Sequence, residues 1–461
     1  MKKFTKVLYK SYIYIINSIA FFPVLISAAL FILSICILYF EGTHFSSEIK
    51  KNFPFLFVSS YQNARQILST LITGIISLTV FSFSMVMIVL NQASSNFSPR
   101  VIPGVITKKA HQIILGFCIG TIIYSLIIVH NVQNTTQAFR FPQIGILVAE
   151  ILGIICLILF VYFIHSISQS IQVDNILVKV LNDTLSALKA EKGNDDKANG
   201  EKDHIEEPST KNWIIIDSIE SGYYRNFETT KLLLTACKED LIIEISNPRG
   251  AFILKGIPFL KINKKIKDEL KEMILNTFIF YQEEYINENF IYGFKQTTEV
   301  AVKALSPGIN DPGTAIRAID HLTLMYSEML TRSMDEYYSD SENHLRIIQR
   351  NYSLDDLLYN YLTPIREYGN SDVNIVLKLL KCFETLIELE KGKERYLSLF
   401  HRHIDIILED ADKNIVNKID RGKINNILEQ LNTHFKKENH FQKKLKIKSE
   451  IYKNDLFRFD S

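Results

Sequence analysis

Long apolar segments occupy the first third of the chain and do not recur after it. Three of the four stretches that contain them lack any Asp, Glu, Lys or Arg. Their apolar cores lie at about Ile19–Phe40, Ile67–Leu90, Ile113–Val129 and Ile144–Ile164. An α-helix needs about 20 residues to cross a hydrocarbon layer about 30 Å thick. The pattern therefore predicts a mainly α protein, with a four-helix transmembrane domain over residues 1–165 and a soluble region after it.

Charges near the first core predict how the spans are oriented. Four lysines precede that core: Lys2, Lys3, Lys6 and Lys10. The apolar run behind them is longer than the 7–15 residues of a signal peptide, so we expect an uncleaved span with its lysines in the cytoplasm. The first connection, which this orientation places outside the cytoplasm, also contains basic residues and so weakens the pattern: Lys50, Lys51 and Arg65. With an even number of spans, both termini and the soluble region are expected to be cytoplasmic.

Patterning divides the rest of the chain into segments. Apolar residues keep a helical spacing beyond the fourth span, and a charged stretch of small residues follows that cannot build a core. Branched residues and turn residues such as Asn247–Gly250 then indicate short strands. Helical spacing resumes afterwards, with breaks that include Ser339–Ser341, and predicts a bundle of five or six helices. The predicted segments are a helical extension (166–190), a flexible linker (191–211), a small β unit (212–262), a cytoplasmic helical bundle (263–435) and a basic tail (436–461).

Charge and cysteine content narrow the class of protein. Residues 1–165 carry 11 Lys and Arg against 3 Asp and Glu, whereas the remainder carries 41 against 47. A mildly acidic soluble region lacks the concentrated basic face that binds nucleic acid, so no nucleic-acid partner is expected. The five cysteines form no CxxC pair, so a disulfide framework is not expected either.

The second span carries polar residues at a strict seven-residue repeat. Seven residues at about 100° each fall about 20° short of two turns, so these side chains share one slowly drifting face. Interhelical packing by small residues is one interpretation. A water-lined path is the other interpretation. Both can hold if several copies of the chain each contribute this helix to a shared axis. The repeat consists of Thr70, Ser77, Ser84, Asn91 and Ser98, of which the first four are the candidate pore-lining residues.

Two further features lie within the spans. Gly116 and Gly120 form a GxxxG motif, which lets helices approach closely. Glu150 is a carboxyl group about a turn and a half into the fourth span, where an ionisable residue is costly. It is either a proton or cation site that faces the bundle interior, or a hydrated residue at the outer interface near Arg140.

The segment Ala304–Ala315 (ALSPGINDPGTA) joins two apolar helical stretches. Asp311 is placed to cap the second helix, with Pro312 at its first position. This favours an ordered corner between helices. Since a helix N-terminus also attracts anions, the alternative is an anion or partner site formed by Ser306, Asn310, Asp311, Thr314 and Arg317.

Other chemistry-bearing residues give weaker signals. His401 and His403 are two residues apart on a helix and are expected to be surface histidines, not metal ligands. The chain contains no GxSxG, HExxH, P-loop or GxGxxG motif. We therefore expect no enzyme activity, no cofactor and no metal.

Two segments resemble a known family. Leu90–Arg100 (LNQASSNFSPR) and the Ala304–Ala315 segment are similar to the signature segments of an uncharacterised bacterial membrane-protein family, domain of unknown function 2254. Ser221–Tyr223 and Ile365–Gly369 support the resemblance, which covers nearly the whole chain in the expected order. It implies a bacterial integral membrane protein with four N-terminal spans, and it supplies no activity, ligand or catalytic residue.

Two functions are compatible with these patterns. The first is an oligomeric channel or transporter for a small ion in the bacterial inner (plasma) membrane, with a cytoplasmic assembly or gating domain. The second is a non-transporting membrane scaffold or sensor whose cytoplasmic domain binds a ligand or partner. The polar stripe and Glu150 favour the first, and the large soluble region favours the second. The expected partners are the lipid bilayer, further copies of this chain and a small ion.

Overall fold

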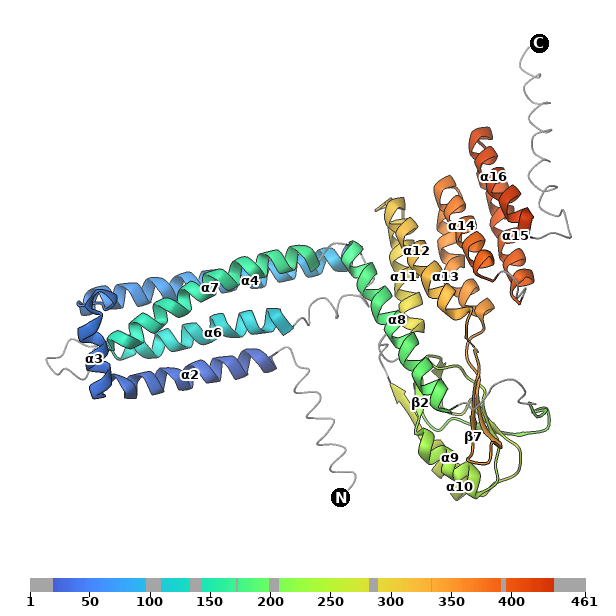
Figure 1. Ribbon diagram of the computed structural model, residues 1–461, viewed down its shortest axis with the longest axis horizontal. Coiled ribbons are helices and arrows are strands. Elements are labelled where there is room, and N and C mark those ends of the chain that lie inside the picture. The colour runs from blue at the N-terminus through green and yellow to red at the C-terminus, as the bar shows by residue number, and fades with distance from the viewer. Residues whose placement is uncertain are drawn as a thin grey trace, which may run out of the picture. The chain divides into compact units, whose positions relative to one another are not determined.

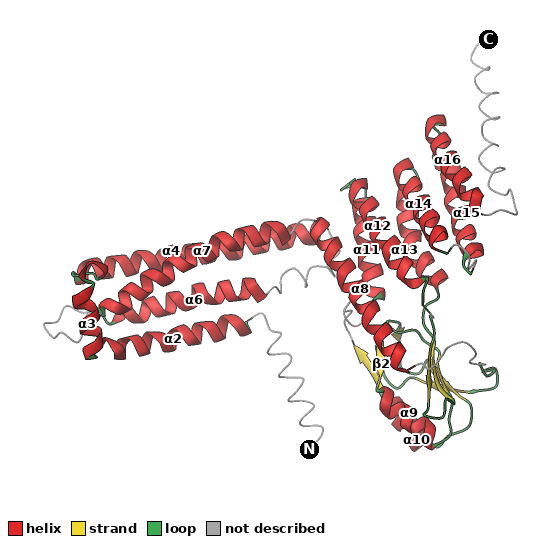
Figure 2. Cartoon of the chain, viewed as in Figure 1, coloured by secondary structure: helices red, strands yellow, loops and turns green. Residues whose placement is uncertain are grey.

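The chain forms two units, Met1–Asn175 and Ile176–Ser461. The structure, a computed structural model, describes residues 20–96, 109–132, 142–170, 173–198, 207–281, 289–332, 334–390 and 395–434. Helices predominate in both units, and every strand found among these residues belongs to the second unit (Figure 2).

Four long apolar helices form the first unit (Figure 1). They are α2 (Phe21–Glu41), α4 (Tyr61–Asn96), α6 (Lys109–His130) and α7 (Gln143–Ser170). The shortest has 21 residues and at about 1.5 Å per residue reaches about 31 Å, enough to cross a bilayer core. This confirms the predicted four-helix fold of the N-terminal region. Helix α3 (His44–Asn52) and the 3-10 turn η1 (Pro54–Leu56) connect α2 to α4.

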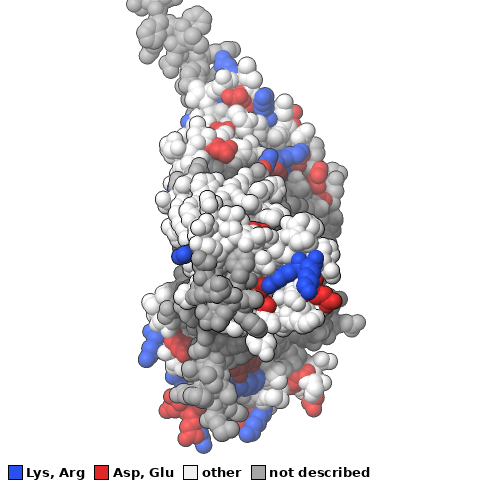
Figure 3. Space-filling model, turned by 90° about the vertical axis from the view of Figure 1, so that its left-hand side faces the viewer, with Lys and Arg blue, Asp and Glu red and all other residues white. Residues whose placement is uncertain are grey.

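Apolar side chains cover the outside of this unit, while small polar ones lie inside it. Val80 and Val161 are 61% and 68% exposed, whereas Ser34, Thr121 and Ser125 are fully buried. In Figure 3 the α3 end of the unit faces the viewer, and mostly uncharged atoms surround one group of basic and acidic side chains there. An apolar exterior of this extent matches a hydrocarbon environment.

The GxxxG motif of α6 is a close-packing site, as predicted. A Cβ atom at Gly116 would lie 2.7 Å from Pro23 Cα of α2, and one at Gly120 would lie 2.7 Å from Leu30 Cδ1. The Ser27 hydroxyl donates to the Gly116 carbonyl at 3.4 Å. Only a residue without a side chain lets α2 and α6 approach this closely.

Two small sheets form the β part of the second unit. The larger has the order β1 (Ile214–Asp217), β5 (Pro258–Ile262), β3 (Ile243–Ile245), β8 (Leu345–Gln349) and β7 (Glu336–Ser339). All its pairings are antiparallel except β3 with β8, which is parallel with Ile243 opposite Ile347. The smaller sheet joins β4 (Phe252–Ile253), β2 (Gly222–Phe227) and β6 (Phe278–Tyr281). Helices α9 (Thr229–Lys238) and α10 (Asp268–Leu275) belong to the same part.

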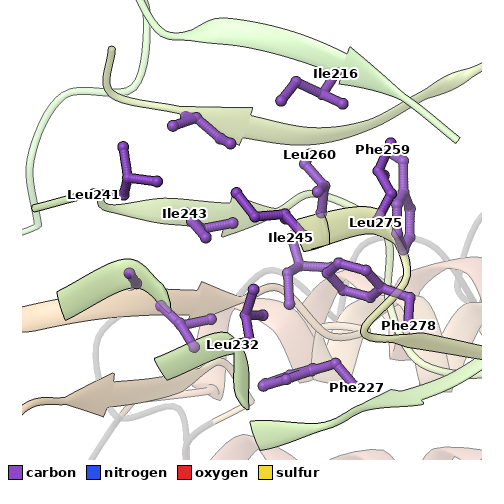
Figure 4. Packing of buried hydrophobic residues seen from close by; sticks show 14 of the residues in the cluster. Ile216, Phe227, Leu232, Leu241, Ile243, Ile245, Phe259, Leu260, Leu275 and Phe278 are labelled. Carbon is purple, nitrogen blue, oxygen red and sulfur yellow. The ribbon is translucent and has the colours of Figure 1, made fainter. Parts of the chain in front are cut away.

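An apolar core lies between the sheets and these helices. Figure 4 shows Ile243, Ile245 and Leu260 of the larger sheet together with Phe227, Leu232 and Phe278. The rings of Phe259 and Phe278 meet edge to face with their centroids 4.9 Å apart. Burying such side chains stabilises the fold by about 1.5–3 kcal/mol each.

The predicted boundary between the β unit (212–262) and a purely helical bundle (263–435) is wrong. Strands β6, β7 and β8 all lie beyond residue 262, and α9 interrupts the predicted β unit. Strands β7 and β8 flank the Ser339–Ser341 break, and β8 completes the larger sheet by pairing with β3, about a hundred residues earlier in the chain. A sheet closed by so distant a strand leaves little local signal.

After β6, the described residues of this unit contain six helices, in agreement with the predicted bundle of five or six. They are α11 (Ile291–Ala304), α12 (Pro312–Met329), α13 (Leu354–Gly369), α14 (Val373–Leu389), α15 (Leu397–Asn414) and α16 (Lys418–His434). Helix α8 (Val173–Ala198) packs on α11 where a Cβ atom at Gly293 would lie 1.8 Å from Thr184 Oγ1. Helix α8 runs into the predicted flexible linker (191–211), and the basic tail (436–461) lies outside the described residues.

Candidate functional site

The polar stripe of α4 faces outward from the first unit. Thr70, Ser77, Ser84 and Asn91 are all exposed. At 100° per residue they lie roughly opposite the side of α4 that packs on its neighbours. Ser98 lies outside the described residues. The buried side of α4 consists of Ala64, Leu68, Ile72 and Ile75.

Hydroxyl groups of this stripe, and that of Thr73 on the same side of α4, are hydrogen-bonded within their own helix. Thr73 donates to the Ser69 carbonyl at 2.8 Å, and Ser77 donates to the Thr73 carbonyl at 3.0 Å. Ser84 donates to the Val80 carbonyl at 2.9 Å. The helix thereby satisfies three hydroxyl donors, which lowers the cost of facing lipid. The stripe is consequently compatible with lipid and helix contacts as well as with water.

Glu150 and Glu41 are the two acidic side chains of the spanning helices among the residues described. Glu150 of α7 is half-buried and forms no hydrogen bond or ion pair there, and Arg140 lies outside the described residues. Glu41, at the end of α2, accepts from the Ile144 backbone N–H at 3.3 Å and pairs with Lys50. A carboxylate at the first turn of α7 complements the helix dipole. No sequence pattern predicts this contact, which joins α2 to α7.

The Ser306–Thr314 corner has the predicted capping geometry. Asp311 caps α12 by accepting from the Thr314 backbone N–H at 3.2 Å and from its hydroxyl at 2.6 Å. Asn310 has φ +50°, and the Ser306 hydroxyl donates to the Lys303 carbonyl at 2.6 Å. The Asp311 carboxylate already occupies the position that an external anion would take. The side chain of Arg317 is exposed, and the geometry favours the ordered corner.

His403 is not a surface histidine, contrary to the sequence prediction. It is 8% exposed, stacks on Phe383 and lies 2.9 Å from a carboxylate oxygen of Asp355. Burial lowers the pKa of His403, although Asp355 opposes this effect. Its neighbour His401 lies 3.4 Å from Asp405. Among the described residues, no three His, Cys, Asp or Glu side chains are grouped to hold a metal.

Arg350, at the end of β8, links segments that are distant in sequence. It pairs with Glu207 at 2.7 Å, with Asp335 at 2.6 Å and with Glu244 at 3.4 Å. Arg350 lowers the pKa of Glu207, and burial together with Glu207 raises the pKa of Tyr337 to about 12. Glu207 falls in the predicted flexible linker, yet its carboxylate is held in this network.

A small polar cavity lies beside this network. Its charged lining consists of Arg249, Arg332 and Glu336, and its volume is about 30 Å³, room for roughly two water molecules. Glu336 accepts from Arg249 and, at 3.0 Å, from the Asn351 amide, while Tyr338 donates to it at 2.6 Å. These residues are far apart in sequence. The sequence pattern predicts the turn that contains Arg249 and singles out none of the others.

These observations define a class of protein: four apolar helices that are long enough to cross a membrane, followed by a unit of small sheets and helices. A family model described as "Predicted membrane protein (DUF2254)" matches residues 16–385. The chain belongs to this family, which confirms the resemblance seen in its signature segments.

Similar proteins in the comparisons carry no assigned function. The chain is 21% identical over 378 residues to an uncharacterized protein of Mycobacterium bovis, covering 80% of this chain and 72% of that protein. An uncharacterized protein of Mycobacterium tuberculosis matches with the same identity and the same coverage. No solved structure gives a significant match.

Proposed function

We propose that this protein is a homo-oligomer of the bacterial inner membrane in which the polar face of α4 lines a path for a small ion. The polar face consists of Thr70, Thr73, Ser77, Ser84 and Asn91. The observation that supports the proposal is the exposure of this whole face on the side of α4 opposite its buried residues. The positive-inside pattern supports cytoplasmic termini and a cytoplasmic second unit.

Close packing inside one copy supports a path between copies. Tyr124, Ile128 and Ile146 are fully buried there, and the Tyr124 hydroxyl donates to the Gly145 carbonyl at 3.1 Å. This packing favours a path between copies, and the outward face of α4 repeats polar groups along its length.

The residues on this face suit helix contacts between copies. Gly74 borders the polar face, and a Cβ atom there would meet nothing within 4 Å. Small residues allow a second helix to approach the backbone closely. The Asn91 amide carries two donors and one acceptor, which lipid cannot satisfy, so water or a neighbouring helix suits it better than hydrocarbon.

The second candidate is a membrane sensor whose cytoplasmic unit binds a ligand and which transports nothing. The polar cavity beside Arg249, Arg332 and Glu336 favours it, since a cavity with several charged and amide groups around it is a candidate binding site. The two candidates are compatible if the ligand regulates the path.

Disulfide cross-linking tests whether α4 helices meet. In a background without the five native cysteines, Ser77→Cys should form a dimer under mild oxidation in membranes. Ile158→Cys is a matched control, because Ile158 is an exposed apolar residue of α7, 62% exposed. Ion flux through liposomes that contain the purified protein then tests transport. Equal cross-linking at both positions, or at neither, would argue against a shared α4 axis. Liposomes that show no ion flux would argue against transport and favour the sensor function.

A further inference from the structure

We infer that the polar cavity of the second unit binds the anionic oxygen of a small soluble carboxylate or phosphate. This inference rests on the sensor function proposed above and names the chemistry of its ligand. The lining comes from four segments of the chain. They are the Asn247–Gly250 turn, the start of α11, the residues Met329, Arg332, Met334 and Glu336, and the pair Asn351 and Tyr352 after β8.

Asn289 supplies the first buried donor. It is 4% exposed, and its Oδ1 accepts from the Ile291 backbone N–H at 2.9 Å, which fixes the orientation of the amide. Its Nδ2 has no hydrogen-bond partner among the described residues. Gly250 keeps φ at +85° beside it, where a Cβ atom would lie 2.6 Å from that Nδ2. Leaving such a donor unpaired is costly, so an acceptor is expected to occupy the space beside it.

Arg332 supplies the second donor. One of its terminal nitrogens donates to the Leu188 carbonyl of α8, while its buried Nε has no acceptor among the residues that the structure describes. Two arginines and one glutamate are the charged residues of the lining. The glutamate is already engaged by Arg249, Tyr338 and Asn351. The remaining positive charge and the two N–H groups select an anionic oxygen.

The apolar part of the lining defines the rest of the ligand. Met329, Met334 and Tyr352 border the cavity. The two donor atoms are buried, and a cavity of about 30 Å³ is smaller than the anion as a whole. A lining side chain therefore has to move when the anion enters, and a methionine adapts more readily than a branched residue. A short apolar group on the anion would then contact these side chains. A terminal nitrogen of the same guanidinium donates to the Leu188 carbonyl, so an anion that moves Arg332 would also move α8, which makes α8 the element that responds to the ligand.

Thermal unfolding of the full-length protein in detergent tests the site. The one tryptophan, Trp213, directly precedes β1 and reports on the second unit. At constant ionic strength, inorganic phosphate, acetate and butyrate are compared with chloride. At ten times Kd a bound anion should raise the unfolding midpoint by about 3–6 °C. Butyrate should act at lower concentration than acetate, because its propyl chain contacts the methionines.

The variant Asn289→Asp separates binding from folding. It keeps the Oδ1 acceptor for Ile291 and replaces the Nδ2 donor by a negative oxygen. It should fold, unfold at a higher midpoint without anions, and lose affinity for butyrate about tenfold or more. Arg332→Gln should lose the same response, whereas Arg402→Gln, which removes an arginine that is 59% exposed on α15, should keep it.

The outcomes separate this site from the α4 path. No midpoint shift with any of the three anions overturns the inference, as does a shift of equal size in wild type and Asn289→Asp. Neither result bears on cross-linking through α4 or on ion flux. A shift that Asn289→Asp and Arg332→Gln abolish supports the site whether or not the protein conducts ions.

Discussion

Glu336→Gln removes the negative half of an ion pair that is mostly closed to solvent. The side chains of Arg249 and Glu336 are 12% and 13% exposed. Breaking a buried pair on one side leaves an uncompensated charge and costs about 3–5 kcal/mol. We expect a cost at the lower end of this range, because about an eighth of each side chain is still exposed to solvent. For a unit of this size about 3 kcal/mol lowers the unfolding midpoint by roughly 6–12 °C.

A double-mutant cycle with Arg249→Met isolates the pair from its surroundings. The double variant leaves no lone charge, so its loss of unfolding free energy should fall short of the sum of the single losses by about 1–3 kcal/mol. Trp213 fluorescence during urea unfolding in detergent measures each variant. If the losses add to within about 0.5 kcal/mol, or if Glu336→Gln leaves the midpoint unchanged, the pair does not hold the turn to β7 and this reasoning fails.

Three further predictions concern the cap, a helix contact and acid stability. Asp311→Ala should lower the unfolding free energy by about 0.5–2 kcal/mol, and Pro312→Ala by less; an unchanged midpoint would mean that the cap does not stabilise the corner. Gly120→Leu should prevent α2 from packing on α6 and abolish correctly folded protein, as judged by size-exclusion chromatography, while Gly422→Leu in α16, a position in open space, should leave folding intact. The Arg346 guanidinium lowers the pKa of Asp340 to about 2, below the unfolded value of about 3.9. The charged Asp340 therefore stabilises the fold above about pH 4, and this stabilisation is lost as the pH falls towards 2. Asp340→Asn should make the midpoint less sensitive to pH between 5 and 3, and an equal pH slope in both proteins would refute the assignment.

Features set by neighbouring residues could be predicted from the sequence. The four spans follow from runs of apolar residues, and the cap at Asp311 needs only Pro312 and Thr314 beside it. The GxxxG contact is similar, because Gly116 and Gly120 fall on one face of α6. In each case the residues that determine the feature lie in the same helix or within one turn of its end.

Features set by distant contacts could not be predicted. Strands β7 and β8 are short, and the parallel pairing of β8 with β3 shows only in the folded protein. The Ser339–Ser341 break, which the pattern predicts between two helices, is the only local sign of the turn that joins β7 to β8. The cavity unites Arg249, Asn289 and Arg332, which no spacing rule connects. His403 was assigned to the surface because helical spacing does not reveal that Phe383 and Asp355 lie against it.

Solvent access along α4 tests the central claim most directly. In the background without native cysteines, Ser77→Cys and Ser84→Cys should react with a small water-soluble thiol reagent in folded, oligomeric protein. Modification should also change ion flux through liposomes, while Ile158→Cys stays unreactive. Unreactive thiols at both α4 positions would contradict a water-lined path and leave only packing between helices.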